Sequence, residues 1–73
     1  MPALRIGVLG CSDFAWRKAI PALLKAPELK LAAVASRSPE KAAKFASAFG
    51  GDPVVGYERL IERPDVDAVY VPL

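Results

Sequence analysis

Short apolar runs alternate with amphipathic segments along this chain, and this alternation limits the possible folds more than any other feature. The apolar runs cover residues 4–9, 29–35, 53–55 and 67–71, and helix-like patterns cover residues 14–25, 39–49 and 57–62. Nearly continuous apolar runs are typical of strands buried on both faces of a parallel sheet. Strands joined through helices form right-handed crossovers. The sequence therefore predicts an α/β Rossmann-type parallel sheet, strand order 3-2-1-4, with helices on both faces.

The helix at residues 39–49 has the clearest boundaries. Ser38 is a favourable N-cap, Pro39 suits the first helical position, and Gly50 follows the last apolar residue. Within residues 14–25, Pro21 is an interior breaker that should either kink the helix or start its second half.

Length and composition bound the class of protein. The chain has 73 residues, and its sheet ends after the fourth strand, where a doubly wound domain normally has two more strands. We therefore expect residues 1–73 to be the N-terminal part of a dinucleotide-binding domain, truncated after that strand. A net charge of +2 without runs of like sign predicts neither nucleic-acid nor membrane binding. One cysteine, no histidine and no apolar leader favour a cytoplasmic protein without a metal site.

The turn after the first strand is a candidate phosphate site, because open parallel sheets bind ligands where strand order reverses. In place of a glycine-rich fingerprint it has Gly10, Cys11, Ser12, Asp13, Phe14 and Ala15. Gly10 permits the tight turn, and helix amides near Asp13 and Phe14 can face a pyrophosphate. Ser12 replaces the usual second glycine, so either the turn differs or the hydroxyl donates a hydrogen bond to phosphate. The alternative is an ordinary strand-to-helix turn.

The end of the second strand predicts which cofactor binds. An acidic side chain about 20 residues beyond the fingerprint selects NAD, whereas an arginine accommodates the 2′-phosphate of NADP. This chain has Ser36, Arg37 and Ser38 there and no carboxylate. NADP is thus favoured over NAD, with Arg37 pairing with the phosphate or stacking on adenine. The plainer interpretations are a solvated charge for Arg37 and only a helix cap for Ser38.

The side chains of four residues are interpreted as structural, although Cys11 is also counted among the cofactor-binding residues of the first turn. A thiol at a helix start can have a lowered pKa, but Cys11 lacks a histidine or second cysteine nearby and is expected to pack in the turn. Trp16 is expected to be partly buried and to pack against its neighbours. The alternative is that it borders the substrate cleft. Tyr57 is interpreted as the start of a short helix and Tyr70 as part of a buried fourth strand, and neither is predicted to be a site residue.

Three stretches, RIGVLGCSDFA, AVASRSPEKA and GYERLIERPDVDAVYVPL, together resemble the N-terminal half-domain of the glucose-fructose oxidoreductase and inositol dehydrogenase family (Gfo/Idh/MocA). GCSDFAWRKAIPAL and DAVYVPL are most similar to its nucleotide-sugar 3-ketoreductases. The resemblance implies an NADP-dependent oxidoreductase transferring hydride to or from a sugar-like carbonyl, such as a nucleotide-linked 3-keto-deoxysugar. It further implies homo-oligomer formation through a C-terminal domain.

By this resemblance, the pyrophosphate is lined by Gly10, Ser12, Asp13 and Phe14, the 2′-phosphate by Ser36, Arg37 and Ser38, and the nicotinamide side by Pro72 and Leu73. The family's catalytic lysine, in a Glu-Lys-Pro motif, falls beyond Leu73, so no catalytic residue is expected in this chain. The alternative functions are a non-catalytic dinucleotide- or CoA-binding module, such as a redox-sensing regulator, and a self-contained small binding module.

Overall fold

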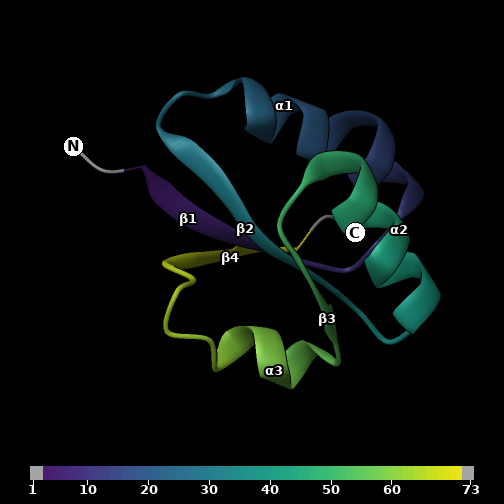
Figure 1. Cartoon of the computed structure of the whole chain (residues 1–73). Coiled ribbons are helices and arrows are strands. Elements are labelled where there is room, and N and C mark those ends of the chain that lie inside the picture. Colours follow the sequence, from purple (N-terminus) through teal and green to yellow (C-terminus); the bar gives the residue numbers. More distant parts are fainter. Residues whose placement is uncertain (1–2, 72–73) are drawn as a thin grey trace.

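The computed structural model describes residues 3–71, and a single parallel sheet forms its centre (Figure 1). The strands are β1 (Leu4–Leu9), β2 (Leu29–Ser36), β3 (Asp52–Val55) and β4 (Ala68–Tyr70). Their order is β3-β2-β1-β4, and every neighbouring pair is parallel. The predicted order 3-2-1-4 is confirmed. Strand order reverses between β1 and β4, because the chain builds from β1 out to β3 and then crosses back.

The helical segments are η1 (Ala15–Ala19), α1 (Ile20–Lys25), α2 (Pro39–Phe49) and α3 (Tyr57–Ile61). The first predicted helix therefore has two parts, a π-helical turn and an α-helix. At their junction the Ile20 N–H donates to the Ala15 carbonyl, five residues back. The wide turn comes just before Pro21, which has no N–H to donate and would crowd a regular helix. Pro21 thus starts the second half, one of the two predicted outcomes.

Helices cover both faces of the sheet, with α1 and α2 on one face and α3 on the other (Figure 1). The first face buries Ile6, Val8, Ala15, Ile20, Leu23, Leu31, Val34 and Phe45. The second face buries a smaller cluster of Ala33, Ala35, Val54 and Leu60. Since successive side chains of a strand point to opposite faces, Gly7 of β1 faces α3. An added Cβ at Gly7 would lie 3.0 Å from Leu60 Cδ1, so glycine allows α3 to pack closely on the central strand.

The fourth strand corrects one prediction. β4 was expected to be buried, but its residues are exposed, and Tyr70 has 39% of its surface accessible. The physical reason is its position: β4 pairs only with β1 among the described residues and lies at the edge of the sheet. An apolar run predicts burial only when elements cover both sides of the strand.

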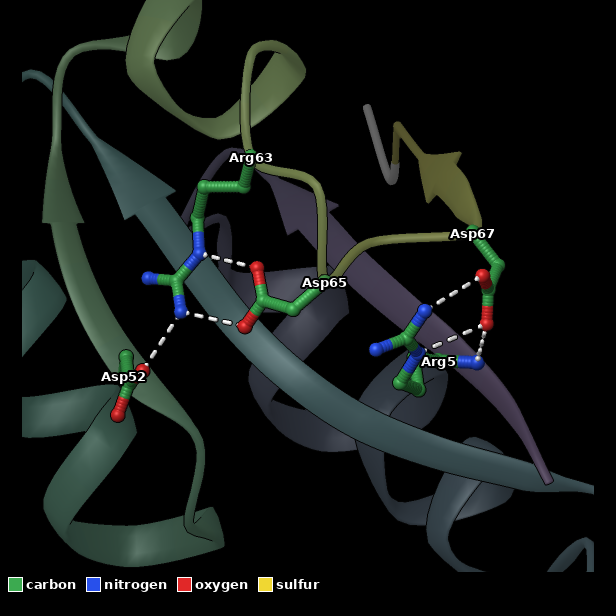
Figure 2. A network of polar contacts seen from close by, with 5 residues as sticks. All are labelled: Arg5, Asp52, Arg63, Asp65 and Asp67. Carbon is green, nitrogen blue, oxygen red and sulfur yellow. Dashed lines mark hydrogen bonds and ion pairs between the residues drawn. The ribbon is translucent and has the colours of Figure 1, made fainter. Parts of the chain in front are cut away.

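Two ion-pair groups secure the segment between α3 and β4 at the end of the sheet opposite the predicted site (Figure 2). Asp67 accepts hydrogen bonds from the Arg5 backbone N–H at 2.8 Å and from its guanidinium at 3.1 Å. Arg63 donates to Asp65 and to Asp52, each at 2.7 Å. These contacts lower the pKa of Asp65 and of Asp67, chiefly because each carboxylate accepts hydrogen bonds from an arginine.

Candidate functional site

The turn after β1 begins at Gly10, directly beside the end of β2. The Gly10 N–H donates to the Ala35 carbonyl at 2.9 Å, which fixes the turn to the neighbouring strand. Its φ of 113° lies in the region that favours glycine, and a Cβ there would meet no atom within 4 Å. Gly10 therefore presents bare backbone to open space, as the approach of a diphosphate requires.

Ser12 begins the helix that follows this turn. Its carbonyl oxygen accepts a hydrogen bond from the Trp16 N–H at 3.1 Å. Its hydroxyl oxygen accepts a hydrogen bond from the Ala15 N–H, also at 3.1 Å. The serine in place of the second fingerprint glycine thus has a local role, because its side chain binds one of the helix-start amides. A hydrogen bond from this hydroxyl to a phosphate stays a prediction.

The loop from β2 to α2 is organised by two serines. Ser36 is 6% exposed, and its hydroxyl oxygen accepts from the Ser38 N–H at 3.1 Å. The Ser38 hydroxyl oxygen in turn accepts a hydrogen bond from the Lys41 N–H at 3.4 Å, which confirms the predicted N-cap of α2. The Gly56 N–H donates to the Ser36 carbonyl at 3.0 Å, so the turn before α3 is joined to the same loop.

These loops enclose a groove of about 300 Å³ at the carboxyl ends of β1 and β2. It is lined by Gly10, Cys11, Ser12, Ser36, Arg37, Ser38, Lys41 and Tyr57. We call it the nucleotide groove. It brings together six of the residues predicted from two separate stretches of sequence, because parallel strands end at the same edge of the sheet.

The other predicted site residues lie elsewhere. Asp13 lines an adjoining groove of about 330 Å³ with Trp16 and Lys44, and its carboxylate pairs with Arg17 at 3.1 Å. Phe14 lines a third, apolar groove and is not among the residues that line the nucleotide groove. Pro72 and Leu73 lie outside the described residues.

Two lining residues were missed by sequence reasoning. Lys41 lies three residues after the N-cap Ser38, a spacing that places both on one side of α2, and this signal could have identified it. Tyr57 does start α3 as predicted, yet that same position brings its ring to the groove. The Arg37 guanidinium carbon lies 5.9 Å from the centre of this ring.

The groove carries positive charge. Arg37 and Lys41 are both exposed, and the lining contains no carboxylate among the described residues. At the opposite end of the sheet, three aspartates accept hydrogen bonds from arginines: Asp67 from Arg5, and Asp52 and Asp65 from Arg63. An anion entering the groove therefore meets two cations that no carboxylate of the lining neutralises, which favours a phosphate ligand.

Cys11 and Trp16 have the predicted packing roles. Cys11 is partly buried, its Sγ lies 3.7 Å from the Ala35 carbonyl oxygen, and burial raises the pKa of its thiol. A raised pKa leaves less thiolate, which does not suit a nucleophile. Trp16 packs edge-on against Phe45 and Phe49, with ring centres 5.0 and 4.9 Å away.

Within residues 3–71 there is no group of three or more histidine, cysteine, aspartate or glutamate side chains that could hold a metal ion. The helices of this part of the chain are all too short or too polar to cross a membrane.

The strand order, the glycine turn and the cationic groove at the reversal of strand order define a Rossmann-type dinucleotide-binding unit. The chain belongs to the Gfo/Idh/MocA oxidoreductase family, whose NAD-binding Rossmann-fold profile matches residues 4–73. The expected family resemblance is confirmed.

Two relatives have names that describe oxidoreductases of sugars. A dTDP-3,4-didehydro-2,6-dideoxy-alpha-D-glucose 3-reductase of Saccharopolyspora spinosa is 59% identical over 70 residues, which are 96% of this chain and 21% of the relative. A D-xylose 1-dehydrogenase (NADP(+)) of Haloferax volcanii is 37% identical over 71 residues, 96% of this chain and 22% of that protein. The chain thus spans about a fifth of the length of these relatives.

A solved structure has nearly the same fold. The crystal structure of a 3-ketoreductase from Actinomadura kijaniata, in complex with NADP and TDP-benzene, superposes with a TM-score of 0.94 at 55% identity. The match covers 97% of this chain and 22% of that protein.

Proposed function

We propose that this chain is the N-terminal, cofactor-binding part of an NADP-dependent oxidoreductase that transfers hydride to or from a nucleotide-linked 3-keto-deoxysugar. The observation that carries the cofactor assignment is the nucleotide groove, which has two cations and no carboxylate in its described lining. The substrate assignment is supported by the 3-reductases at 51–59% identity. Cytoplasmic location and homo-oligomeric assembly remain predictions.

The groove fits NADP better than NAD. A carboxylate at the end of β2 would accept the ribose 2′-hydroxyl of NAD and repel the 2′-phosphate of NADP. Here that position is Ser36, followed by Arg37, whose planar guanidinium can donate two parallel hydrogen bonds to a phosphate. Lys41 supplies a second charge from the first turn of α2.

Each part of the chain has a separate task in binding. Gly10 allows the diphosphate to approach the backbone, and Ser12 starts the helix whose first amides, near Asp13 and Phe14, would bind it. Ser36 and Ser38 hold the β2–α2 loop through two hydrogen bonds, which keeps Arg37 at the rim of the groove. Once bound, NADP supplies the hydride acceptor or donor through its nicotinamide ring.

The test is the cofactor preference of the Arg37→Ala variant, made in the protein expressed from its natural coding sequence. A hydrogen-bonded charge contact contributes about 1.5–3 kcal/mol, so NADPH should bind about 10- to 150-fold more weakly. The affinity for NADH should change less than about twofold, because NADH has no 2′-phosphate to lose a contact. Fluorescence titration measures both dissociation constants.

Arg59→Ala is the matched control, because Arg59 is exposed on α3 and does not line the nucleotide groove. It should leave both affinities unchanged. Equal losses for NADPH and NADH in Arg37→Ala would refute recognition of the 2′-phosphate and favour adenine stacking. NADPH binding without oxidation in the presence of a dTDP-3-keto-deoxysugar would refute the enzyme and favour the non-catalytic alternative.

A further inference from the structure

Arg37 is held in a different way from the arginines that form ion pairs. Arg5, Arg17 and Arg63 pair with aspartates, whereas Arg37 has no carboxylate partner among residues 3–71. Its guanidinium instead lies over the ring of Tyr57. An aromatic face attracts a cation through its quadrupole but carries no net charge. The contact therefore restrains the guanidinium and leaves its full charge available to an anion.

Tyr57 itself is well anchored. Its half-buried side chain packs against the cluster that contains Leu60 and Val54, beneath the sheet. The preceding residue, Gly56, has φ of 98° and donates its N–H to the Ser36 carbonyl. The backbone that precedes Tyr57 is thus tied to Ser36, the residue before Arg37, and the exposed arginine lies over an anchored ring.

A carboxylate in the place of the ring would act differently. It would hold the arginine more strongly, but its charge would repel the phosphate that Arg37 is to bind. A side chain without an aromatic face would leave the arginine side chain unrestrained. Binding of the phosphate would then have to restrict more of its conformations. An aromatic ring avoids both the repulsion of the phosphate and the conformational cost of ordering a free arginine.

We propose that Tyr57 is a positioning residue that holds Arg37 at the rim of the nucleotide groove and thereby strengthens the preference for NADPH over NADH. This inference rests on the proposed function, since it assigns the 2′-phosphate to Arg37. Tyr57 acts through Arg37 and not through a contact of its own with the phosphate.

The experiment compares NADPH and NADH dissociation constants for Tyr57→Phe, Tyr57→Leu and Tyr57→Met in the protein expressed from its natural coding sequence. Loss of the ring should lower the preference for NADPH by about two- to fivefold. Tyr57→Phe keeps the aromatic face and should keep the preference. Leucine and methionine both preserve apolar packing, so at least one ring-free variant is expected to fold, and circular dichroism verifies this.

The double variant Arg37→Ala/Tyr57→Leu separates positioning from a merely structural role. It should have the same NADPH:NADH ratio as Arg37→Ala alone, because without the guanidinium the ring has nothing to position. Equal weakening of both cofactors by the ring-free variants, or an unchanged ratio, would overturn the inference.

If Arg37→Ala abolishes the preference for NADPH while the ring-free Tyr57 variants retain it, the proposed function stands and only the role of Tyr57 is refuted. If the unmodified protein shows no preference for NADPH, both are refuted.

Discussion

Replacing Gly7 by alanine tests the packing that brings the crossover helix onto the central strand. The new Cβ would lie 3.0 Å from Leu60 Cδ1, 3.1 Å from Val66 Cγ1 and 3.2 Å from Leu60 Cγ. Leu60 cannot turn away into solvent, because its side chain is fully buried among Ala33, Ala35 and Val54. Either α3 must shift outward or side chains must leave their preferred rotamers.

The two energetic effects of this substitution have opposite signs. Overpacking a close-packed interior costs about 1–3 kcal/mol. Alanine also restricts the unfolded chain, which stabilises the fold by about 0.4–1 kcal/mol when the backbone conformation suits it. Gly7 lies in a regular strand and has no positive φ, so this gain applies in full. Overpacking is the larger effect, and we expect Gly7→Ala to lower the free energy of unfolding by about 1–2 kcal/mol.

Urea denaturation of the protein expressed from its natural coding sequence measures this loss. Leu60→Ala alone should cost about 2–5 kcal/mol, because it leaves a cavity. In the double variant Gly7→Ala/Leu60→Ala the added methyl group fills part of the space left by the three removed leucine carbons, so its loss should be smaller than the two single losses together. A stability of Gly7→Ala equal to or above that of the unmodified protein, or strictly additive losses, would refute the packing argument.

Two further predictions concern stability. The carboxyl pKa values of Asp65 and Asp67 are lower in the folded than in the unfolded state, so their ion pairs stabilise the fold above roughly pH 4 and are lost as pH falls through the folded pKa. Urea midpoints measured from acid to neutral pH should therefore depend less on pH in Asp65→Asn and Asp67→Asn, and an unchanged pH profile would contradict this. Ser38→Ala should cost about 1 kcal/mol through the lost cap of α2, whereas Ser38→Asp should retain this stability yet weaken NADPH binding. Equal NADPH affinity of Ser38→Asp and the unmodified protein would argue against a phosphate beside the cap.

The predicted order of the strands was correct because its cause is local. Apolar runs, a glycine after the first strand and short connections leave few topologies once crossovers must be right-handed. The boundaries of α2 were equally predictable, since Ser38 and Gly50 terminate it through their own backbone and side-chain preferences. The cationic end of β2 could also be recognised, because it lies at a known distance along the chain from the first turn.

The errors and omissions share a different cause. The apolar residues of β4 look like a buried strand in sequence, yet their exposure depends on which other elements lie beside them. The π-helical turn before Pro21 is one of several ways to accommodate a proline, and local preference does not choose between them. Phe14 and Tyr70 line one apolar groove although they are far apart in sequence, and no local pattern predicts that they share it.

Local signals in the amino-acid sequence specify the parallel sheet, its order and the arginine at the end of the second strand, because strand periodicity, turn residues and helix caps act over a few neighbouring positions. Only the tertiary structure placed Tyr57 under Arg37 and Lys41 beside them. Those contacts join residues from different crossovers, and they form because parallel strands bring their carboxyl ends, with the loops that follow, to one edge of the sheet.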